Sequence, residues 1–289
     1  MVVIYKTIHD FAKELYALLK TDRDNVIGVA GFTGEGKSAF TTQLGKEYCK
    51  VANTYWGFDR MTWSRAEMMR WIDGDGPDKK GQLPEYSLII PDELFQMFYR
   101  RNWYENDQID AIATFNMCRD RHLLTIGNIP NFWELDAGFT NRIRFYVYIP
   151  QRGVAWVFQQ ENNPFSNDPW NTGENKKIFR KNLNPFNCHN FLCQINYDDW
   201  TPEEKEEYYN IRNTKRVEAV NEVKTARNHK NHLLRKQRDS AICWINNDLF
   251  YYDDVKKVYS RPSFKMIGEN LHLSDVYIGE ILRSHEEPS

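Results

Sequence analysis

Apolar runs alternate along the chain with amphipathic and polar stretches, and this alternation predicts an α/β fold. Residues 5–20 carry apolar side chains three to four positions apart, the spacing of an amphipathic helix: Ile8, Phe11, Leu15, and Leu18 or Leu19. The nearly uninterrupted apolar run at 25–31 has the character of a strand buried on both faces. A helical segment follows to about residue 50, so the chain begins with a helix, a strand, a loop and a second helix.

Two more apolar runs predict further strands of the same sheet. The run SLIIPDE at 87–93 follows a surface loop rich in glycine, proline and charge, and HLLTIGN at 122–128 follows a mainly helical stretch. Ser64, with Glu67 three positions later, predicts the start of a short helix between the first two strands. Residues 143–158 form two β-rich halves around Gly153 and predict a hairpin.

Composition places the chain among globular proteins. Of its 289 residues, 41% are hydrophobic and 27% are charged, and this length suits one full-sized domain with a smaller appendage. We find no run of about 20 apolar residues and no signal-peptide pattern. We therefore expect a cytoplasmic protein without membrane insertion, in the host cytoplasm if it is viral. The five cysteines are scattered and odd in number, which argues against a disulfide framework.

A phosphate-binding loop follows the first buried strand. The segment GFTGEGKS matches the Walker A pattern and lies between the predicted strand and helix, which is the context that its mechanism needs. Glycines let backbone N–H groups turn toward phosphate oxygens, the lysine reaches the β and γ phosphates, and the serine binds magnesium. We therefore expect ATP and Mg²⁺ as cofactors, with nucleotide held by Gly31, Phe32, Thr33, Gly34, Glu35, Gly36, Lys37, Ser38 and Ala39.

A second acidic motif ends the second predicted strand. Asp92 follows the apolar run where a Walker B carboxylate would complete the magnesium site with Ser38. Glu93 comes next, and an acid at this position polarises the attacking water, so we expect it to be the catalytic base. The alternative is that Glu93 stabilises the first turn of the following helix.

Candidates for the remaining catalytic roles come from later in the chain. Asn128 ends the third predicted strand and would contact the γ-phosphate or the attacking water, although a strand-end asparagine also starts turns. Arg142, Arg144 and Arg152 are candidates for an arginine finger that acts across a subunit boundary, and Arg142 is our first choice. Surface solvation or a structural ion pair is the alternative for each arginine.

The order of these motifs resembles that of additional-strand P-loop ATPases. The similarity covers about residues 25–160 and is closest to the zonula occludens toxin-like ATPases of phages and archaeal mobile elements, which are related to the FtsK and HerA translocases. The resemblance implies that Lys37 and Ser38 bind nucleotide and magnesium, that Asp92 and Glu93 form the Walker B pair, and that Asn128 is a sensor. It also implies a ring-shaped homo-oligomer that moves double-stranded DNA. Unlike the toxin-like members, this sequence shows no membrane segment after the ATPase domain.

The C-terminal part is highly charged. Residues 198–239 predict a helix, and its stretch 212–238 holds nine basic residues against two acidic ones, which suits either phosphate contact or a solvated face. Residues 261–284 predict two helices around a tight turn, the second capped by Ser274, and resemble a helix-turn-helix. A small protein-docking domain is the alternative. Cys188, His189 and Cys193 are too few for a zinc site, and we interpret the many tryptophans and tyrosines as core and interface residues.

Together these patterns predict an α/β P-loop NTPase with a mainly parallel sheet flanked by helices. We expect the ATPase domain at 1–186, an irregular segment and charged helical linker at 187–240, and a small helical domain at 241–289. The leading functional hypothesis is an ATP-hydrolysing DNA motor or remodeller of a virus or mobile element, for genome packaging or DNA transfer. The alternatives are an ATP-dependent DNA-binding switch or loader that recruits a partner protein, and a small-molecule kinase.

Overall fold

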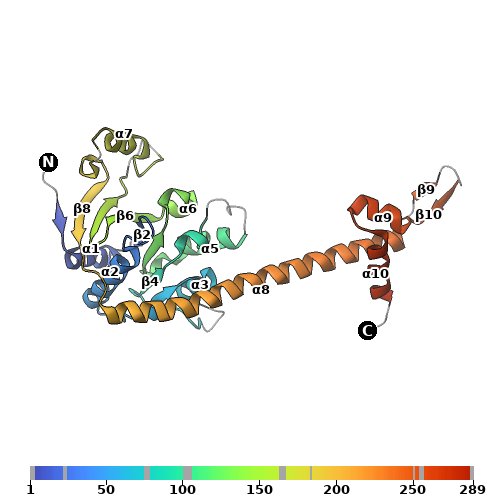
Figure 1. The fold of residues 1–289 in the computed structure, drawn as a ribbon, viewed down its shortest axis with the longest axis horizontal. Helices are drawn as coiled ribbons and strands as arrows, with labels where there is room; N and C mark the ends of the chain where they lie inside the picture. Colours follow the sequence, from blue (N-terminus) through green and yellow to red (C-terminus); the bar gives the residue numbers. More distant parts are fainter. Residues whose placement is uncertain are drawn as a thin grey trace. The chain divides into compact units, whose positions relative to one another are not determined.

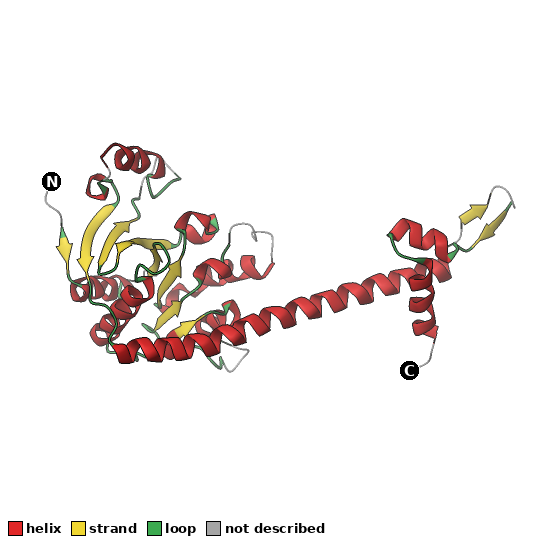
Figure 2. Ribbon diagram, viewed as in Figure 1, coloured by secondary structure: helices red, strands yellow, loops and turns green. Residues whose placement is uncertain are grey.

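The contacts of the chain divide it into two compact units, Met1–Val217 and Glu218–Ser289 (Figure 1). The computed structural model describes residues 4–21, 25–74, 79–99, 106–162, 167–182, 184–249, 251–253 and 257–286. The first unit is built on an eight-stranded sheet, and the second is mainly helical with one short hairpin (Figure 2).

The eight-stranded sheet of the first unit has the order β1-β8-β7-β6-β2-β5-β4-β3. Its strands are β1 (Tyr5–Lys6), β2 (Asn25–Ala30), β3 (Met61–Thr62), β4 (Leu88–Pro91), β5 (Leu124–Ile129), β6 (Ile143–Gln151), β7 (Val154–Gln159) and β8 (Phe191–Asn196). The three strands expected from apolar runs, β2, β4 and β5, are confirmed, and all three are buried along their length. β5 lies between β2 and β4 and is parallel to both.

The other half of the sheet changes direction. β6 runs parallel to β2, and β7 returns antiparallel to β6, so the predicted hairpin is confirmed. Gly153 in its turn has φ 87°, a conformation that side chains other than glycine rarely adopt. β8 then pairs antiparallel with β7. This strand lies in the segment 187–240, where we expected an irregular segment and a linker, because six residues flanked by polar ones give only a weak periodic signal.

Two helices cover one face of the sheet. α1 (Ile8–Leu19) packs along α2 (Lys37–Ala52), and α2 contacts β2, β4 and β5. The amphipathic helix expected at 5–20 is confirmed, since Phe11, Leu15 and Leu19 are fully buried. Phe11 reaches β6, where its ring meets that of Phe145 edge-on at 5.3 Å. These contacts fix α2, and with it the phosphate loop, against the centre of the sheet.

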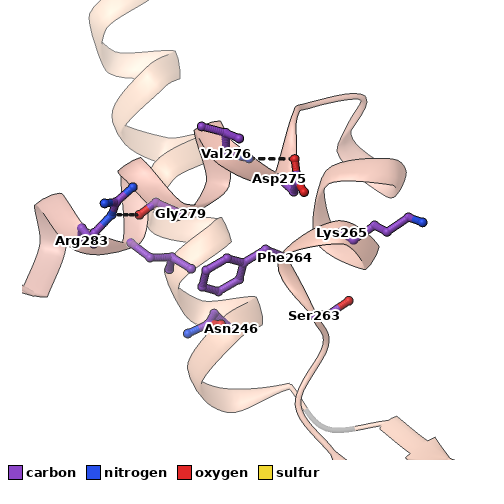
Figure 3. A pocket seen from close by; sticks show the side chains of 9 residues that line it. Asn246, Ser263, Phe264, Lys265, Asp275, Val276, Gly279 and Arg283 are labelled. Atoms are coloured by element: carbon purple, nitrogen blue, oxygen red, sulfur yellow. Dashed lines mark hydrogen bonds between the residues drawn. The ribbon is translucent and has the colours of Figure 1, made fainter.

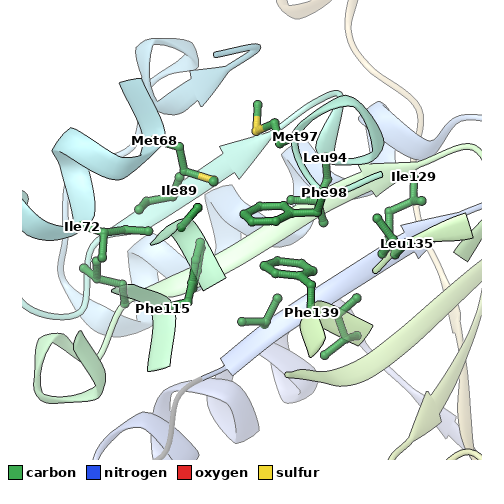
Figure 4. Packing of buried hydrophobic residues seen from close by; sticks show 14 of the residues in the cluster. Met68, Ile72, Ile89, Leu94, Met97, Phe98, Phe115, Ile129, Leu135 and Phe139 are labelled. Atoms are coloured by element: carbon green, nitrogen blue, oxygen red, sulfur yellow. The ribbon is translucent and has the colours of Figure 1, made fainter. Parts of the chain in front are cut away.

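Three short helices cover the opposite face of β2, β4 and β5. They are α3 (Arg65–Asp73), α4 (Leu94–Met97) and α5 (Asn106–Met117), and their apolar side chains pack together as shown in Figure 4. Ser64 caps α3 as expected, accepting a hydrogen bond from the backbone N–H of Glu67 at 3.2 Å. Phe98 and Phe139 stack in the centre of this cluster with ring centroids 4.0 Å apart. The first unit also contains short helical turns: η1 (Phe58–Arg60), η3 (Cys118–Arg121), η4 (Phe132–Glu134) and α6 (Ala137–Thr140).

The long helix α8 (Pro202–Asp248) begins in the first unit. Thr201 and Glu204 form a capping box, in which each side chain accepts a hydrogen bond from the backbone N–H of the other. The Glu204 carboxylate also pairs with Lys46 of α2. Three turns further on, the Lys215 ammonium donates to the carbonyl oxygen of Met61 at 2.9 Å and pairs with Glu67 of α3 at 3.0 Å. The start of α8 is therefore attached to both helical layers of the first unit.

The second unit has its own small core. It contains the end of α8, the hairpin of β9 (Tyr251–Asp253) and β10 (Val258–Ser260), and the helices α9 (Phe264–Leu271) and α10 (Asp275–Glu286). The two helices and the Ser274 cap are confirmed, whereas the hairpin was not expected. A cavity of about 610 Å³ lies in this unit and is lined by residues that include Asn246, Phe264 and Val276. Figure 3 shows these side chains. The buried side chains are Ile242, Ile267, Ile278, Ile281 and Leu282.

Within the described residues, the chain has no helix that is both long enough and apolar enough to span a bilayer.

Candidate functional site

The segment Gly31–Ser38 follows β2 and comprises a loop, Gly31 to Gly36, and the first two residues of α2, as the Walker A pattern requires. Two of its glycines are sterically necessary. A Cβ on Gly31 would lie 2.7 Å from the carbonyl oxygen of Ile149, and Gly36, the N-cap residue of α2, has φ 94°. The loop thus runs close to β6 and presents the amino end of α2 to the cavity, where backbone N–H groups favour an anion.

Lys37 is the first residue of α2, and its side chain folds back over the loop. Its ammonium donates to the carbonyl oxygens of Gly31 at 2.7 Å and of Phe32 at 3.0 Å. Burial lowers the pKa of Lys37, while the nearby carboxylates of Asp92 and Glu93 oppose that change. Phosphate oxygens on the loop would replace the two carbonyl acceptors and would supply the negative charge that a half-buried ammonium requires.

Ser38 and Asp92 bring two oxygen ligands together. The Ser38 hydroxyl donates to Asp92 Oδ1 at 3.0 Å, and the Asp92 side chain is buried, with the residue only 7% exposed. Burial raises the pKa of Asp92, and hydrogen bonds from Tyr208, Asn128 and Ser38 partly offset this effect. Magnesium prefers hard oxygen ligands, and a buried carboxylate gains most from a nearby cation. These residues therefore fit a magnesium ion, the ligand that the Walker motifs led us to expect, and its binding here stays a prediction.

Glu93 lies beside Asp92 at the end of β4 and precedes α4. It occupies the N-cap position of that helix, where its side chain makes no capping hydrogen bond. The alternative that its charge stabilises the first turn stays open. Burial raises the pKa of Glu93 and the charge of Asp92 adds to the increase, whereas Arg216, Arg212 and Lys37 oppose it. The carboxylate lines the same cavity as the phosphate loop. It is therefore placed to accept a proton from water.

Asn128 lies near the end of β5, between the strands that carry the two Walker motifs. Its amide nitrogen donates to Asp92 Oδ1 and lies 3.3 Å from the Ser38 hydroxyl. Its amide oxygen accepts from the Thr41 hydroxyl of α2 at 2.7 Å. The structure thus brings the residue expected to be a sensor into direct contact with both expected magnesium ligands.

Arg142 is distant from these residues within one chain. It precedes β6 on the amino side, and Ile143 pairs with Val26 at the beginning of β2, whereas the phosphate loop follows the end of β2. Its guanidinium donates to the carbonyl oxygen of Phe115. Because β2 and β6 are parallel, Arg142 lies at the opposite edge of the sheet. A contribution to the site of a neighbouring subunit stays a prediction.

Two residues outside the Walker motifs contact the phosphate loop. Arg152, from the turn of the β6–β7 hairpin, donates to the carbonyl oxygen of Gly34 at 3.0 Å and pairs with Asp199 at 2.6 Å. The Tyr197 hydroxyl donates to the carbonyl oxygen of Gly36 at 3.2 Å. Arg152 was one of three arginines considered from sequence, and it is the one that reaches this cavity in its own chain.

The start of α8 closes the other side of the cavity. The Tyr208 hydroxyl donates to Asp92 Oδ2 at 2.7 Å and lies 3.3 Å from the Ser38 hydroxyl, and the residue is only 3% exposed. Burial raises the pKa of Tyr208 above its usual range, so the phenol stays protonated. Tyr208 therefore contacts both expected magnesium ligands. No motif links it to Asp92, which lies 116 positions earlier.

Arg212 lies one turn after Tyr208 on α8 and also lines the cavity. Its guanidinium carbon is 5.8 Å from the centre of the Tyr208 ring, and its Nε is buried without a hydrogen-bond partner in the described part of the chain. An unpartnered cationic donor beside an anion-binding loop favours a negatively charged ligand. The cavity that these groups enclose measures about 300 Å³.

Comparisons with known proteins give weak likenesses to P-loop ATPases. Neither the protein-family models nor the curated proteins contain a match. The N-terminal domain of zonular occludens toxin from Neisseria meningitidis is 13% identical with a TM-score of 0.36, over 55% of this chain and 98% of that one. A chain of the HORMA:CdnC:Trip13 complex from E. coli MS115-1 is 12% identical with a TM-score of 0.34, over 49% and 61%.

The AAA domain of FIGL-1 is 15% identical with a TM-score of 0.34, over 50% of each chain. The present chain thus spans half to three fifths of the second and third of these structures. At these identities the likenesses concern the fold alone. The chain is an α/β protein with the P-loop NTPase fold, in which a mostly parallel sheet is flanked by helices and a Walker A loop follows a central strand.

Proposed function

We propose that this chain hydrolyses ATP. The observation that supports it most is the meeting of Ser38, Asp92 and Asn128 beside the phosphate loop, with Glu93 lining the same cavity. Bound magnesium would be held by Ser38 and Asp92 and would neutralise charge on the phosphates. Lys37 and the amino end of α2 bind the phosphates. Glu93 takes the proton of the attacking water, and Asn128 keeps the oxygen ligands in place.

The reaction is coupled to DNA in this proposal. We infer an oligomeric motor or remodeller in the cytoplasm that acts on double-stranded DNA, for packaging or transfer of a genome. Of the nine basic residues between 212 and 238, Arg212 lines the phosphate cavity, and Lys215 and Arg238 are ion-paired. The others supply sequence-independent attraction to phosphates. The position of β5 between β2 and β4 supports membership of the additional-strand class of P-loop ATPases. Arg142, at the far edge of the sheet, is our candidate for the arginine that acts on a neighbouring subunit.

The test is ATP hydrolysis by the full chain with and without double-stranded DNA, with Glu93→Gln as the control. We expect DNA to stimulate hydrolysis in the unmodified chain. The Glu93→Gln chain should bind ATP with unchanged affinity and lose about a hundredfold or more in kcat, because only the base is removed. Normal turnover by Glu93→Gln would refute the assignment of the base. Turnover that is indifferent to DNA would favour a protein-regulated switch or a small-molecule enzyme.

A second candidate function is an ATP-dependent switch or loader, and the contact between Tyr208 and Asp92 favours it. Binding of magnesium and nucleotide at Ser38 and Asp92 competes with the Tyr208 hydroxyl, so the nucleotide state would be communicated to α8. A motor and a switch differ in whether they move along DNA. A triplex-displacement assay separates them: displacement that depends on ATP and on the length of the track indicates a motor, and its absence with ATP-dependent DNA binding indicates a switch.

A further inference from the structure

One face of the β6–β7 hairpin carries aromatic side chains in register. Along β6, the residues from Ile143 to Ile149 alternate between buried and half-buried, and the half-buried ones include Tyr146 and Tyr148. Across the hairpin, Tyr146 pairs with Phe158 and Tyr148 pairs with Trp156. The ring centroids of these pairs are 5.6 Å and 5.9 Å apart, with interplanar angles of 26° and 33°. The four rings form the floor of a cavity.

Further aromatic side chains form the walls. The cavity measures about 670 Å³, within the range of about 300–1,000 Å³ that is typical of ligand sites. Trp133, Trp170 and Phe179 line it above the floor, and it shares no residue with the phosphate cavity. Trp133 is 46% exposed and Phe179 is 40% exposed, so two large rings at this site remain accessible to water. From sequence we interpreted the tryptophans as core and interface residues. Trp170, 4% exposed, belongs to the core and also borders this cavity, whereas Trp133 is open to it.

A basic helix borders the cavity. α7 (Thr172–Asn182) carries Lys176, Lys177, Arg180 and Lys181 against a single acid, Glu174. Figure 1 shows α7 at the β6–β7–β8 end of the sheet, away from α1 and α2. Lys176 lines the cavity together with Phe179, which lies three positions later on the same helical face. Lys177 is paired with Glu174 at 2.8 Å, whereas Lys176 and Arg180 have no ion-pair partner within the described ranges.

The combination of stacked rings and unpaired cations identifies a class of ligand. A planar group stacks on the rings, and an adjacent anion is attracted by α7. A strand of nucleic acid supplies both at a fixed spacing, since every base is planar and every linkage carries a phosphate. In a duplex the bases are already stacked and paired, so only an unpaired base can enter such a cavity. We propose that the aromatic cavity binds a base of single-stranded DNA while Lys176 and Arg180 contact its backbone.

This site deepens the proposed DNA-linked function, on which its biological role rests, but binding of a single strand does not require ATP. The test therefore measures anisotropy of fluorescein-labelled dT20 with the full chain, without nucleotide, against a duplex of equal length. Loss of ATP hydrolysis with retained dT20 binding would count against the proposed ATPase alone. Hydrolysis without any dT20 binding would count against the aromatic site alone.

The variants compare rings with other apolar groups of similar size. Phe179→Leu keeps the site apolar but removes the ring, and should weaken dT20 binding about tenfold, the order expected for one stacking partner. Phe179→Tyr retains the ring and should stay within about twofold. Lys176→Glu should weaken binding more than Lys177→Glu, which makes the same charge change on a residue that does not line the cavity. The proposal would be overturned if Phe179→Leu and Phe179→Tyr weakened dT20 binding equally, and if Lys176→Glu and Lys177→Glu did so too.

Cross-linking distinguishes this site from the basic stretch of α8, which would also attract DNA. A dT20 strand that contains 5-iodouracil, irradiated in complex with the full chain, should attach to peptides that hold Trp133, Trp156 or Phe179. Attachment confined to residues 212–238 would overturn the proposal. Binding of free thymidine monophosphate as tightly as dT20, with equal dependence on Phe179, is a further outcome to test. That result would overturn the proposal that the ligand is a DNA strand and would assign the cavity to a free nucleotide.

Discussion

The two halves of the eight-stranded sheet use their strands in different ways. In the parallel half, β2, β5 and β4 each place polar residues near their carboxyl ends, and those residues meet at one edge: Lys37 and Ser38 after β2, Asn128 in β5, and Asp92 after β4. In the antiparallel half, the functional surface is one face of the β6–β7 hairpin and not the ends of its strands. Aromatic side chains cover that face. Parallel pairing concentrates reactive groups at strand ends, whereas an antiparallel hairpin leaves one broad surface for recognition.

The two regions also differ in how many partners their side chains have within the protein. At the parallel edge, Ser38, Asp92 and Asn128 hydrogen-bond to one another, and Tyr208 adds a further donor. At the antiparallel face, large rings and the Lys176 ammonium remain open to solvent. Removal of a group from the edge should therefore affect catalysis, and removal of a ring from the face should affect binding with little effect on stability.

The largest expected effect is that of Lys37→Ala. This change removes the ammonium that lies over the phosphate loop. It should lower kcat/KM for ATP by about a hundredfold or more, because in the proposed mechanism the lysine contacts the charge that develops in the transition state. Steady-state phosphate release measures the loss. Lys50→Ala, at the other end of α2 and largely exposed, is the control. Cross-linking of single-stranded DNA to the aromatic cavity should persist in Lys37→Ala, and its loss would show that the two regions are not independent.

The next effect concerns stability. Phe139 is fully buried and stacks on Phe98, so Phe139→Ala should lower the free energy of unfolding by about 3–5 kcal/mol. Phe179→Ala, at the aromatic cavity, should change it by less than about 1 kcal/mol because the ring is 40% exposed. Urea denaturation followed by tryptophan fluorescence reports mainly on the first unit, since eight of the nine tryptophans precede residue 218. Equal losses for the two variants would mean that the aromatic face is part of the core.

The smallest expected effect is that of Tyr208→Phe. The variant loses the hydrogen bond to Asp92, and this hydrogen bond competes with magnesium. The magnesium concentration that gives half-maximal ATP hydrolysis should therefore fall about five- to tenfold. Tyr209→Phe is the matched control, because the neighbouring tyrosine is 41% exposed and also lines the cavity. A magnesium titration at fixed ATP measures both. Identical curves for the two variants would rule out competition at Asp92.

Much of the parallel edge could be predicted from sequence, because its chemistry lies in local motifs. Gly31–Ser38 and the pair Asp92 and Glu93 each follow an apolar run, and a parallel sheet brings the ends of such runs together. Asn128 was expected for the same reason. The predicted boundaries of these strands needed no knowledge of their neighbours, since strands buried on both faces appear as continuous apolar runs.

The remaining features depend on contacts between distant residues. Tyr208 meets Asp92 across 116 positions, and nothing in the charged sequence around it indicates that it is buried. Arg152 reaches Gly34 only because the hairpin turn lies beside the phosphate loop. The aromatic cavity depends on cross-strand register and on the placement of α7, and neither is encoded in a local pattern. Composition alone therefore gave no sign that Trp133 and Trp156 line a cavity.

The attachments of α8 to the first unit have a mechanical consequence. Glu204, Tyr208 and Lys215 are spaced four and seven residues apart, so they form one stripe along the helix, tied to α2, Asp92 and α3 respectively. A helix with side chains is about 10–12 Å wide. A displacement of the Tyr208 hydroxyl by about 3 Å away from Asp92 therefore corresponds to a rotation of the helix by roughly 30° about its axis. A rotation of α8 about its axis would therefore change its contacts with α2, Asp92 and α3 at the same time.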